Sequence, residues 1–186
     1  GYTALLLGEM GIGNTTSAAV VSGYLLDLNA EQVTGRGAGL DDEGFSRKRA
    51  VVSMALSKYS GLSPVEICAN FGGLELAAMT GVVIGGGLCK VPIIIDGMLT
   101  QVSALVAERL LENVKDYLIP SHISKEPVAI KLASKLNLPT VLEANMAVGE
   151  GAGAVMMAQI LRLTDTVFHD ALKFGESGVE QYEKFE

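Results

Sequence analysis

The chain has 186 residues, of which 14 are Lys or Arg and 21 are Asp or Glu, so its formal net charge is −7. This acidic balance argues against nucleic acid as the main partner, and no segment has the ~20 consecutive apolar residues that a membrane span needs. Hydrophobic residues make up 49% and aromatic residues only 5%, which excludes a disordered chain and is typical of aliphatic helices packed on a parallel sheet.

The predicted elements alternate along the chain. Short apolar runs that stop at Gly, Asp or Ser predict strands at residues 2–7, 91–95, 117–119 and 140–142. Helical patterns predict helices at residues 15–26, 46–59, 64–70, 74–88, 98–114, 126–136 and 151 to about 174. This order predicts an α/β fold, a Rossmann-like parallel sheet with helices on both faces.

The domain prediction follows from the same pattern. We expect residues 1–170 to form an α/β nucleotide-binding domain that is incomplete at its N-terminus, because the chain opens directly on a strand typical of a sheet centre. Residues 171–186 are expected to be a helical extension, so that the C-terminal helix contributes to a smaller helical domain. The charged stretch 176–186 predicts a solvated helix end.

The cysteines and histidines indicate the compartment rather than a metal site. Cys68 and Cys89 form no C-x-x-C pair, and with His122 and His169 they lack zinc-ligand spacing. Two widely separated cysteines and no visible signal peptide predict a cytoplasmic protein.

In a parallel sheet, the loops that leave the carboxyl ends of the strands share one edge, where ligands collect. Glu9, Asp96, Ser121 and Glu150 each follow or approach such an end, so we expect them to face one crevice.

The loop at residues 8–16, GEMGIGNTT, follows the first strand. Gly11 and Gly13 allow backbone amides to approach an anion at a helix N-terminus, although a tight strand-to-helix turn would need the same glycines. The loop is neither a Walker A sequence nor the dinucleotide fingerprint G-x-G-x-x-G, which disfavours a dehydrogenase.

The segment at residues 34–42, TGRGAGLDD, has Gly at alternate positions. This pattern predicts a loop whose backbone packs closely against a neighbouring group. Asp41 and Asp42 favour a helix cap over a metal site. Lys48 follows in a basic triplet, a pattern more often typical of a solvated helix face than of a phosphate site.

Two further strand ends carry polar side chains. Asp96 closes a buried strand, where it either accepts hydrogen bonds from ribose hydroxyls or caps the next helix. Ser121 and Ser124 offer hydroxyls to a phosphate, and His122 between them is more often a structural residue than a catalyst.

The last motif, residues 148–154, places Glu150 between glycines at the start of the final long helix. A carboxylate with glycine on both sides can approach a substrate and act as a general base, with Glu9 as a second carboxylate in the same crevice.

Three motifs in this order, GEMGIGNTT, TGRGAGLDD and GEGAGA, make the chain resemble the nicotinate-nucleotide:dimethylbenzimidazole phosphoribosyltransferase family of cobamide synthesis. Asp96-Gly97 and residues 121–127, SHISKEP, fit the same pattern. The resemblance covers essentially the whole chain, and because family members are about twice as long, it implies a C-terminal portion.

The resemblance implies transfer of 5-phosphoribose from nicotinate mononucleotide to a benzimidazole-type base, releasing nicotinate, with no cofactor and no metal. It implies that Glu150 is the general base, that Glu9 lines the site, that Lys48 binds phosphate, and that Met10 and Val148 flank the base. The implied substrate-binding residues are Met10, Gly11, Asn14, Gly37, Lys48, Asp96, Ser124, Val148, Gly151, Ala152 and Gly153.

Relatives in this family are homodimers, and residues 74–88 are a candidate interface. The alternatives to the enzyme are a non-catalytic nucleotide-binding subunit, or a family member that uses adenine or phenols as the base.

Overall fold

The structure is a computed structural model that describes residues 1–146, 148–178 and 183. Its sheet contains β1 (Leu5–Leu7), β2 (Ile93–Ile95) and β3 (Leu118–Pro120), all parallel and in the order β1-β2-β3. Parallel neighbours need crossover connections, and the helices between the strands supply them. The predicted α/β fold with a parallel sheet is confirmed.

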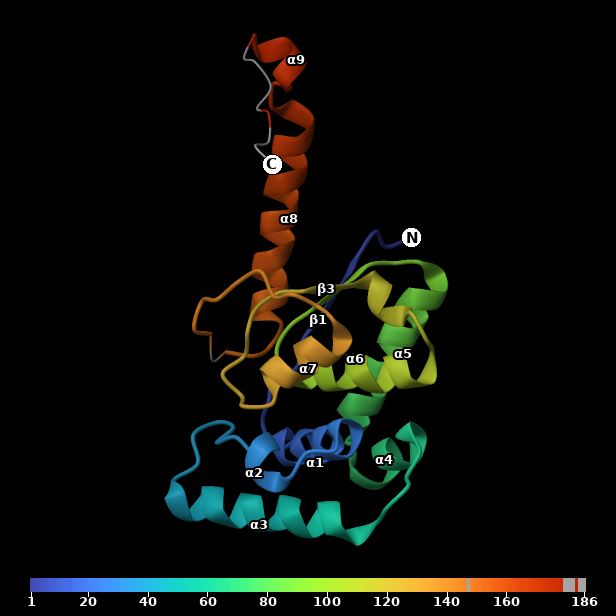
Figure 1. Ribbon diagram of the computed structural model, residues 1–186, viewed down its shortest axis with the longest axis vertical. Coiled ribbons are helices and arrows are strands. Elements are labelled where there is room, and N and C mark those ends of the chain that lie inside the picture. The colour runs from blue at the N-terminus through green and yellow to red at the C-terminus, as the bar shows by residue number, and fades with distance from the viewer. Residues whose placement is uncertain (147, 179–182, 184–186) are drawn as a thin grey trace.

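The helices lie in layers on both faces of this sheet (Figure 1). In chain order they are α1 (Thr15–Leu26), α2 (Ala30–Val33), α3 (Asp42–Lys58), α4 (Pro64–Phe71), α5 (Leu74–Cys89), α6 (Met98–Leu110), the 3-10 turn η1 (Val114–Tyr117), α7 (Ala129–Leu136), α8 (Ala152–Asp170) and α9 (Phe174–Ser177). α8 packs on one face of the sheet, α5, α6 and α7 lie on the other, and α3 is outermost beyond α1.

Alternation along β2 explains why the sheet is covered on both faces. Ile93 and Ile95 are buried in the main core with α6, whereas Ile94 is buried in a smaller cluster with Ala154 and Met157 of α8. A strand that is apolar at every position is expected when helices pack on both faces. Burying each such isoleucine contributes about 1.5–3 kcal/mol.

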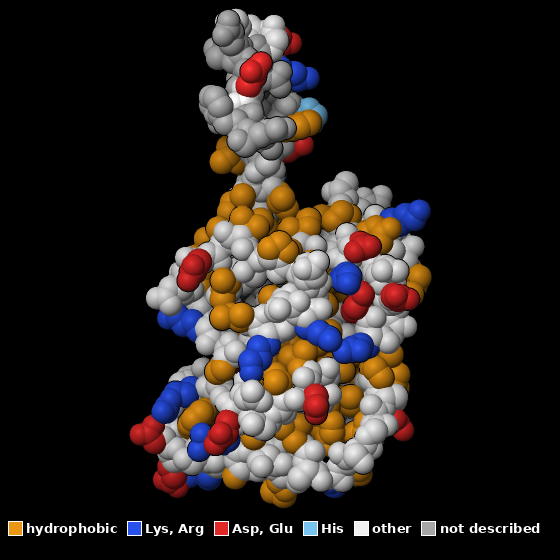
Figure 2. All heavy atoms as spheres, in the orientation of Figure 1, with side chains coloured by type: hydrophobic (Ala, Val, Ile, Leu, Met, Phe, Trp, Pro, Cys, Tyr) orange, Lys and Arg blue, Asp and Glu red, His pale blue; other side chains and the backbone are white. Residues whose placement is uncertain are grey.

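Only the first turns of α8 contact the sheet. The rest of the helix projects from the body (Figure 1), where Leu163 and Phe168 are 66% and 75% exposed. Figure 2 shows hydrophobic side chains gathered where α8 leaves the body. Among the described residues, no helix is long and apolar enough to cross a membrane.

The predicted fourth strand is wrong. Residues 140–142 form a single parallel bridge, between Leu142 and His122. The bridge uses the Leu142 amide to Ser121 O at 3.2 Å and the Ile123 amide to Leu142 O at 3.1 Å. Pro139, just before the segment, has no N–H to extend the ladder.

Several helix boundaries also differ from the prediction. α3 begins at residue 42 because Asp41 caps it, its carboxylate accepting from the Gly44 amide at 2.8 Å, so the capping interpretation of this acidic pair is confirmed. α2 and η1, with 4 residues each, are too short for a periodic signal. α8 ends at Asp170, and of the predicted helix end at residues 176–186, residues 179–182 and 184–186 lie outside the described residues.

Candidate active site

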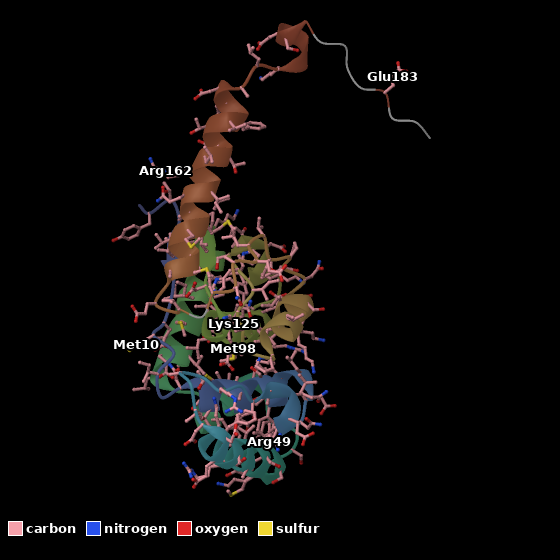
Figure 3. All side chains as sticks on the ribbon, turned by 90° about the vertical axis from the view of Figure 1, so that its left-hand side faces the viewer. Met10, Arg49, Met98, Lys125, Arg162 and Glu183 are labelled. Atoms are coloured by element: carbon pink, nitrogen blue, oxygen red, sulfur yellow. The ribbon has the colours of Figure 1, made fainter. Side chains whose placement is uncertain are left out.

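A crevice of about 690 Å³ opens at the carboxyl ends of the strands, where loops from five parts of the chain meet. Of the residues singled out in the sequence, it is lined by Glu9, Met10, Gly11, Gly37, Asp96, His122, Ser124, Val148 and Glu150. Figure 3 shows Met10, Met98 and Lys125 at one level of the molecule, below α8 and above α3. The expectation that widely separated strand ends face one crevice is therefore confirmed for Glu9, Asp96 and Glu150.

A smaller cavity of about 300 Å³ adjoins the crevice. Both are lined by Gly11, Thr15, Arg36, Gly37 and Ala38, and the smaller one is completed by residues that include Gly13, Thr16, Gly39 and Lys48. The loop after β1, the start of α1, the glycine-rich loop before α3 and Lys48 of α3 therefore surround a space next to the main crevice.

Lys48 is buried, with 7% of the residue exposed, so the solvated-face interpretation is wrong. Its ammonium donates to the Thr15 hydroxyl at 2.8 Å. Burial lowers the pKa of Lys48, and the negative charge of Glu126 offsets part of this shift. A buried cation in a cavity that glycine backbone also lines is chemically suited to hold a phosphate.

The loops that carry Glu9 and Glu150 are joined backbone to backbone. The Glu150 amide donates to Glu9 O at 2.8 Å, and the Glu9 carboxylate accepts from the Gly11 amide at 2.5 Å. Within the described part of the chain, the Glu150 carboxylate has no hydrogen-bond partner. Of the two predicted carboxylates, Glu9 thus supports its own loop, whereas Glu150 remains available to a substrate.

These two loops approach so closely that Gly8 cannot carry a side chain. A Cβ added there would lie 2.3 Å from both Cα and N of Gly151. We expect Gly8→Ala to lower the free energy of unfolding by about 1–3 kcal/mol, because backbone atoms cannot rotate away from a clash as a side chain can. Urea denaturation measures this loss. Gly13→Ala is a poor control because its φ is 81°, so the control is Gly175→Ala, where a Cβ meets nothing within 4 Å.

Asp96 caps a helix, but not the helix expected. Its carboxylate is buried and accepts from the Gly151 amide at 3.1 Å and the Gly153 amide at 2.9 Å, at the start of α8. α6 begins at Met98, with Gly97 as its N-cap residue and no side-chain cap, so the alternative that Asp96 caps that helix is wrong. The resemblance implies that Gly151 and Gly153 bind substrate, but their amides already donate to Asp96.

His122 and Ser121 contact Asp96 in the protein interior. His122 is 2% exposed, and its Nδ1 lies 3.1 Å from the Ser121 hydroxyl and 3.6 Å from Asp96 Oδ1. This fits the structural interpretation of the histidine. Ser121, expected to face the crevice, is fully buried instead and is not among its lining residues.

Four predicted substrate residues line neither cavity: Asn14, Gly151, Ala152 and Gly153. Asn14 is buried, and its Oδ1 has no hydrogen-bond partner in the described structure. For these residues the implied substrate contacts stay predictions.

Glu126 is a site residue that sequence reasoning did not identify. Its carboxylate accepts from the Gly37 amide at 3.0 Å and so ties the glycine-rich loop to the segment before α7. A Cβ at Gly35 would lie 1.8 Å from Glu126 Oε2, which explains the glycine there. Neither partner is near the other in sequence, so no local signal could have revealed the pair.

Arg36 and Phe45 also line the crevice. The Arg36 guanidinium stacks over the Phe45 ring at 4.9 Å from its centroid and pairs with Asp42 at 2.5 Å. The sequence signal for Arg36 was its place between Gly35 and Gly37, as the one cation in a glycine-rich loop.

Comparison with known proteins identifies what the chain is similar to. A family model described as phosphoribosyltransferase matches residues 1–179. The nicotinate-nucleotide–dimethylbenzimidazole phosphoribosyltransferases of Acetivibrio thermocellus and Thermus thermophilus are 38% and 40% identical over 185 and 182 residues. These matches cover 98% and 97% of this chain and 53% and 54% of the relatives.

A solved structure agrees with the sequence relatives. The crystal structure of CobT from Thermus thermophilus matches with a TM-score of 0.89 at 39% identity, over 98% of this chain and 55% of that one. The chain therefore spans about half the length of the proteins that it matches.

Proposed function

The chain belongs to the phosphoribosyltransferase family whose model it matches, and from this premise we propose that it moves 5-phosphoribose from nicotinate mononucleotide to a benzimidazole-type base. The observation that carries the proposal is the position of two side chains: the Glu150 carboxylate on the crevice, which has no hydrogen-bond partner among the described residues, and the buried Lys48 in the adjoining cavity. The substrates are taken from the names of the relatives. The smaller cavity suits the charged phosphate end of the mononucleotide, and the main crevice suits the end at which the reaction takes place.

The phosphate is proposed to enter the smaller cavity. Lys48 supplies a positive charge there, and Gly13 supplies a backbone approach. A phosphate that displaced the Glu9 carboxylate from the Gly11 amide would gain that donor as well. Anchoring the phosphate fixes C1′ of the ribose relative to the crevice, which converts attack by the base into a step within one complex.

The incoming base is proposed to lie in the main crevice between Met10 and Val148, which are 58% and 63% exposed. Glu150 takes the proton from one ring nitrogen while the other nitrogen bonds to C1′. The C1′–N bond to nicotinate breaks, and its electron pair returns to the pyridinium ring. The ring nitrogen of nicotinate is therefore uncharged when it leaves. The step as written involves the two substrates and Glu150 as the proton acceptor.

The decisive experiment combines the purified chain with nicotinate mononucleotide and 5,6-dimethylbenzimidazole and measures released nicotinate. Release that depends on the base supports the enzyme. Because the chain spans about half the length of its relatives, the second candidate is a nucleotide-binding subunit, for which calorimetry would detect binding without release. Adenine and phenols in the same assay test other acceptors.

We also propose that the chain is a cytoplasmic homodimer. α5 leaves a face exposed at Leu74, Val82 and Leu88, and added Cβ atoms at Gly81 and Gly85 would meet nothing within 4 Å. A second copy could approach closely there. Light scattering that gave the mass of a single chain, 19.5 kDa, would contradict the dimer.

A further inference from the structure

We propose that Asp96 is a positioning residue for Glu150, which it holds through the backbone amides of Gly151 and Gly153 rather than through contact with substrate. This inference rests on the proposed function for its kinetic consequence. Its structural part concerns only Asp96 and the loop that leads into α8.

The first support is the geometry of the buried carboxylate. Both oxygens of Asp96 are engaged, each by a different amide at 3.1 or 2.9 Å, and these two amides follow Glu150 by one and three residues. First-turn amides of a helix have no partner within the helix. Asp96 therefore supplies acceptors that α8 itself cannot, at the end where the helix dipole favours a negative charge.

The second support is the backbone of Glu150. Its φ is 65° and that of Gly151 is 81°, two consecutive residues in the left-handed region. A glutamate adopts this conformation at a cost in free energy, and such conformations persist where surrounding contacts over-determine them. Asp96 restrains the residue after Glu150, and the carbonyl of Glu9 restrains Glu150 itself.

The third support is that neighbouring residues hold Asp96 in place within the clamp, by which we mean the two hydrogen bonds that Asp96 accepts from the Gly151 and Gly153 amides. A Cβ at Gly153 would lie 2.1 Å from His122 Nδ1 and 2.6 Å from Asp96 Oδ1, so only glycine permits this approach. His122 and Ser121 pack against Asp96 and leave it little freedom to turn toward the crevice. The Asp96 carboxylate therefore fixes the backbone that follows Glu150, and with it the direction in which the Glu150 side chain leaves the loop.

Asp96→Asn tests the proposal, because the variant keeps the shape but replaces one acceptor oxygen by an NH2 group that faces an amide donor. We expect kcat to fall by about 10- to 100-fold, the range expected for a misplaced catalytic group, while KM for the mononucleotide changes less than about 2-fold. Asp165→Asn, an exposed carboxylate on α8, is the matched control and should leave both constants unchanged.

A double-mutant cycle separates positioning from substrate contact. If Asp96 acts through Glu150, the Asp96→Asn change should have almost no effect in a Glu150→Gln background, since coupled residues are non-additive. Independent, multiplicative losses, or a raised KM for the mononucleotide, would overturn the proposal in favour of a ribose contact.

A measurement on the unaltered protein tests the two hydrogen bonds of the clamp independently of activity. Hydrogen exchange should be slower at the Gly151 and Gly153 amides than at the Glu75 amide, which lies in the first turn of α5, a helix without a side-chain cap. Equal exchange would refute the clamp even if transfer is observed. Protection without any nicotinate release would instead refute the proposed function and leave the clamp standing.

Discussion

Replacing Glu150 by Gln should lower the rate of nicotinate release by about 100- to 10,000-fold, the usual contribution of a positioned general base. The glutamine keeps the size of the side chain and its place on the crevice but cannot accept the proton of the incoming base. The affinity for nicotinate mononucleotide, measured by calorimetry, should stay within about 2-fold, because Glu150 is not among the residues that line the smaller cavity.

The matched control is Glu143→Gln, an exposed glutamate on the segment that leads to Glu150. It should leave both release and binding unchanged. Comparable turnover in the wild type and the Glu150→Gln variant would remove Glu150 from the mechanism. A loss of mononucleotide binding as large as the loss of turnover would point to a structural role.

Glu9→Gln should behave differently, since the two carboxylates have different surroundings. The Glu9 carboxylate accepts from the Gly11 amide, two residues away. An amide side chain can still accept there through its oxygen, so this variant should retain more activity than Glu150→Gln. A reversed order of the two rates in the release assay would exchange the proposed roles.

The fold and the position of the crevice were predictable because they follow from periodicity. The apolar run at residues 93–95 predicts a strand buried on both faces, and the glycines after residue 7 predict a tight turn that follows the first strand. The parallel topology then brings the loops together. Segments too short to show a period, such as α2, give no such signal. The apolar run at residues 140–142 gave a strand signal, yet the segment forms only one bridge.

The polar partners within the site were not predictable in the same way. Asp96 was expected either to bind ribose hydroxyls or to cap α6, its neighbour in sequence, yet it caps α8, which begins more than 50 residues later. Glu126 accepts from Gly37, which lies 89 residues earlier. Such hydrogen bonds depend on how loops from different strands pack at the sheet edge, and nothing in the local sequence encodes them.

Replacing Lys48 by Ala should weaken binding of the mononucleotide by roughly 10- to 100-fold, which corresponds to the about 1.5–3 kcal/mol of a hydrogen bond to a charged group. Binding of the base should change little, because Lys48 lines the smaller cavity and not the main crevice. Lys58→Ala, at the last residue of the same helix, is the control and should bind both ligands normally. Equal losses for both ligands would contradict a phosphate role.

The pH dependence of kcat/KM for the mononucleotide gives this assignment its sharpest test. Burial lowers the pKa of Lys48, and only the protonated amine attracts phosphate, so kcat/KM should fall with rising pH earlier than an exposed lysine would allow. Glu126 raises the same pKa, so Glu126→Gln should move the fall to still lower pH. Lys48→Ala should abolish this step, whereas a step that survives in that variant would assign the titration to another group.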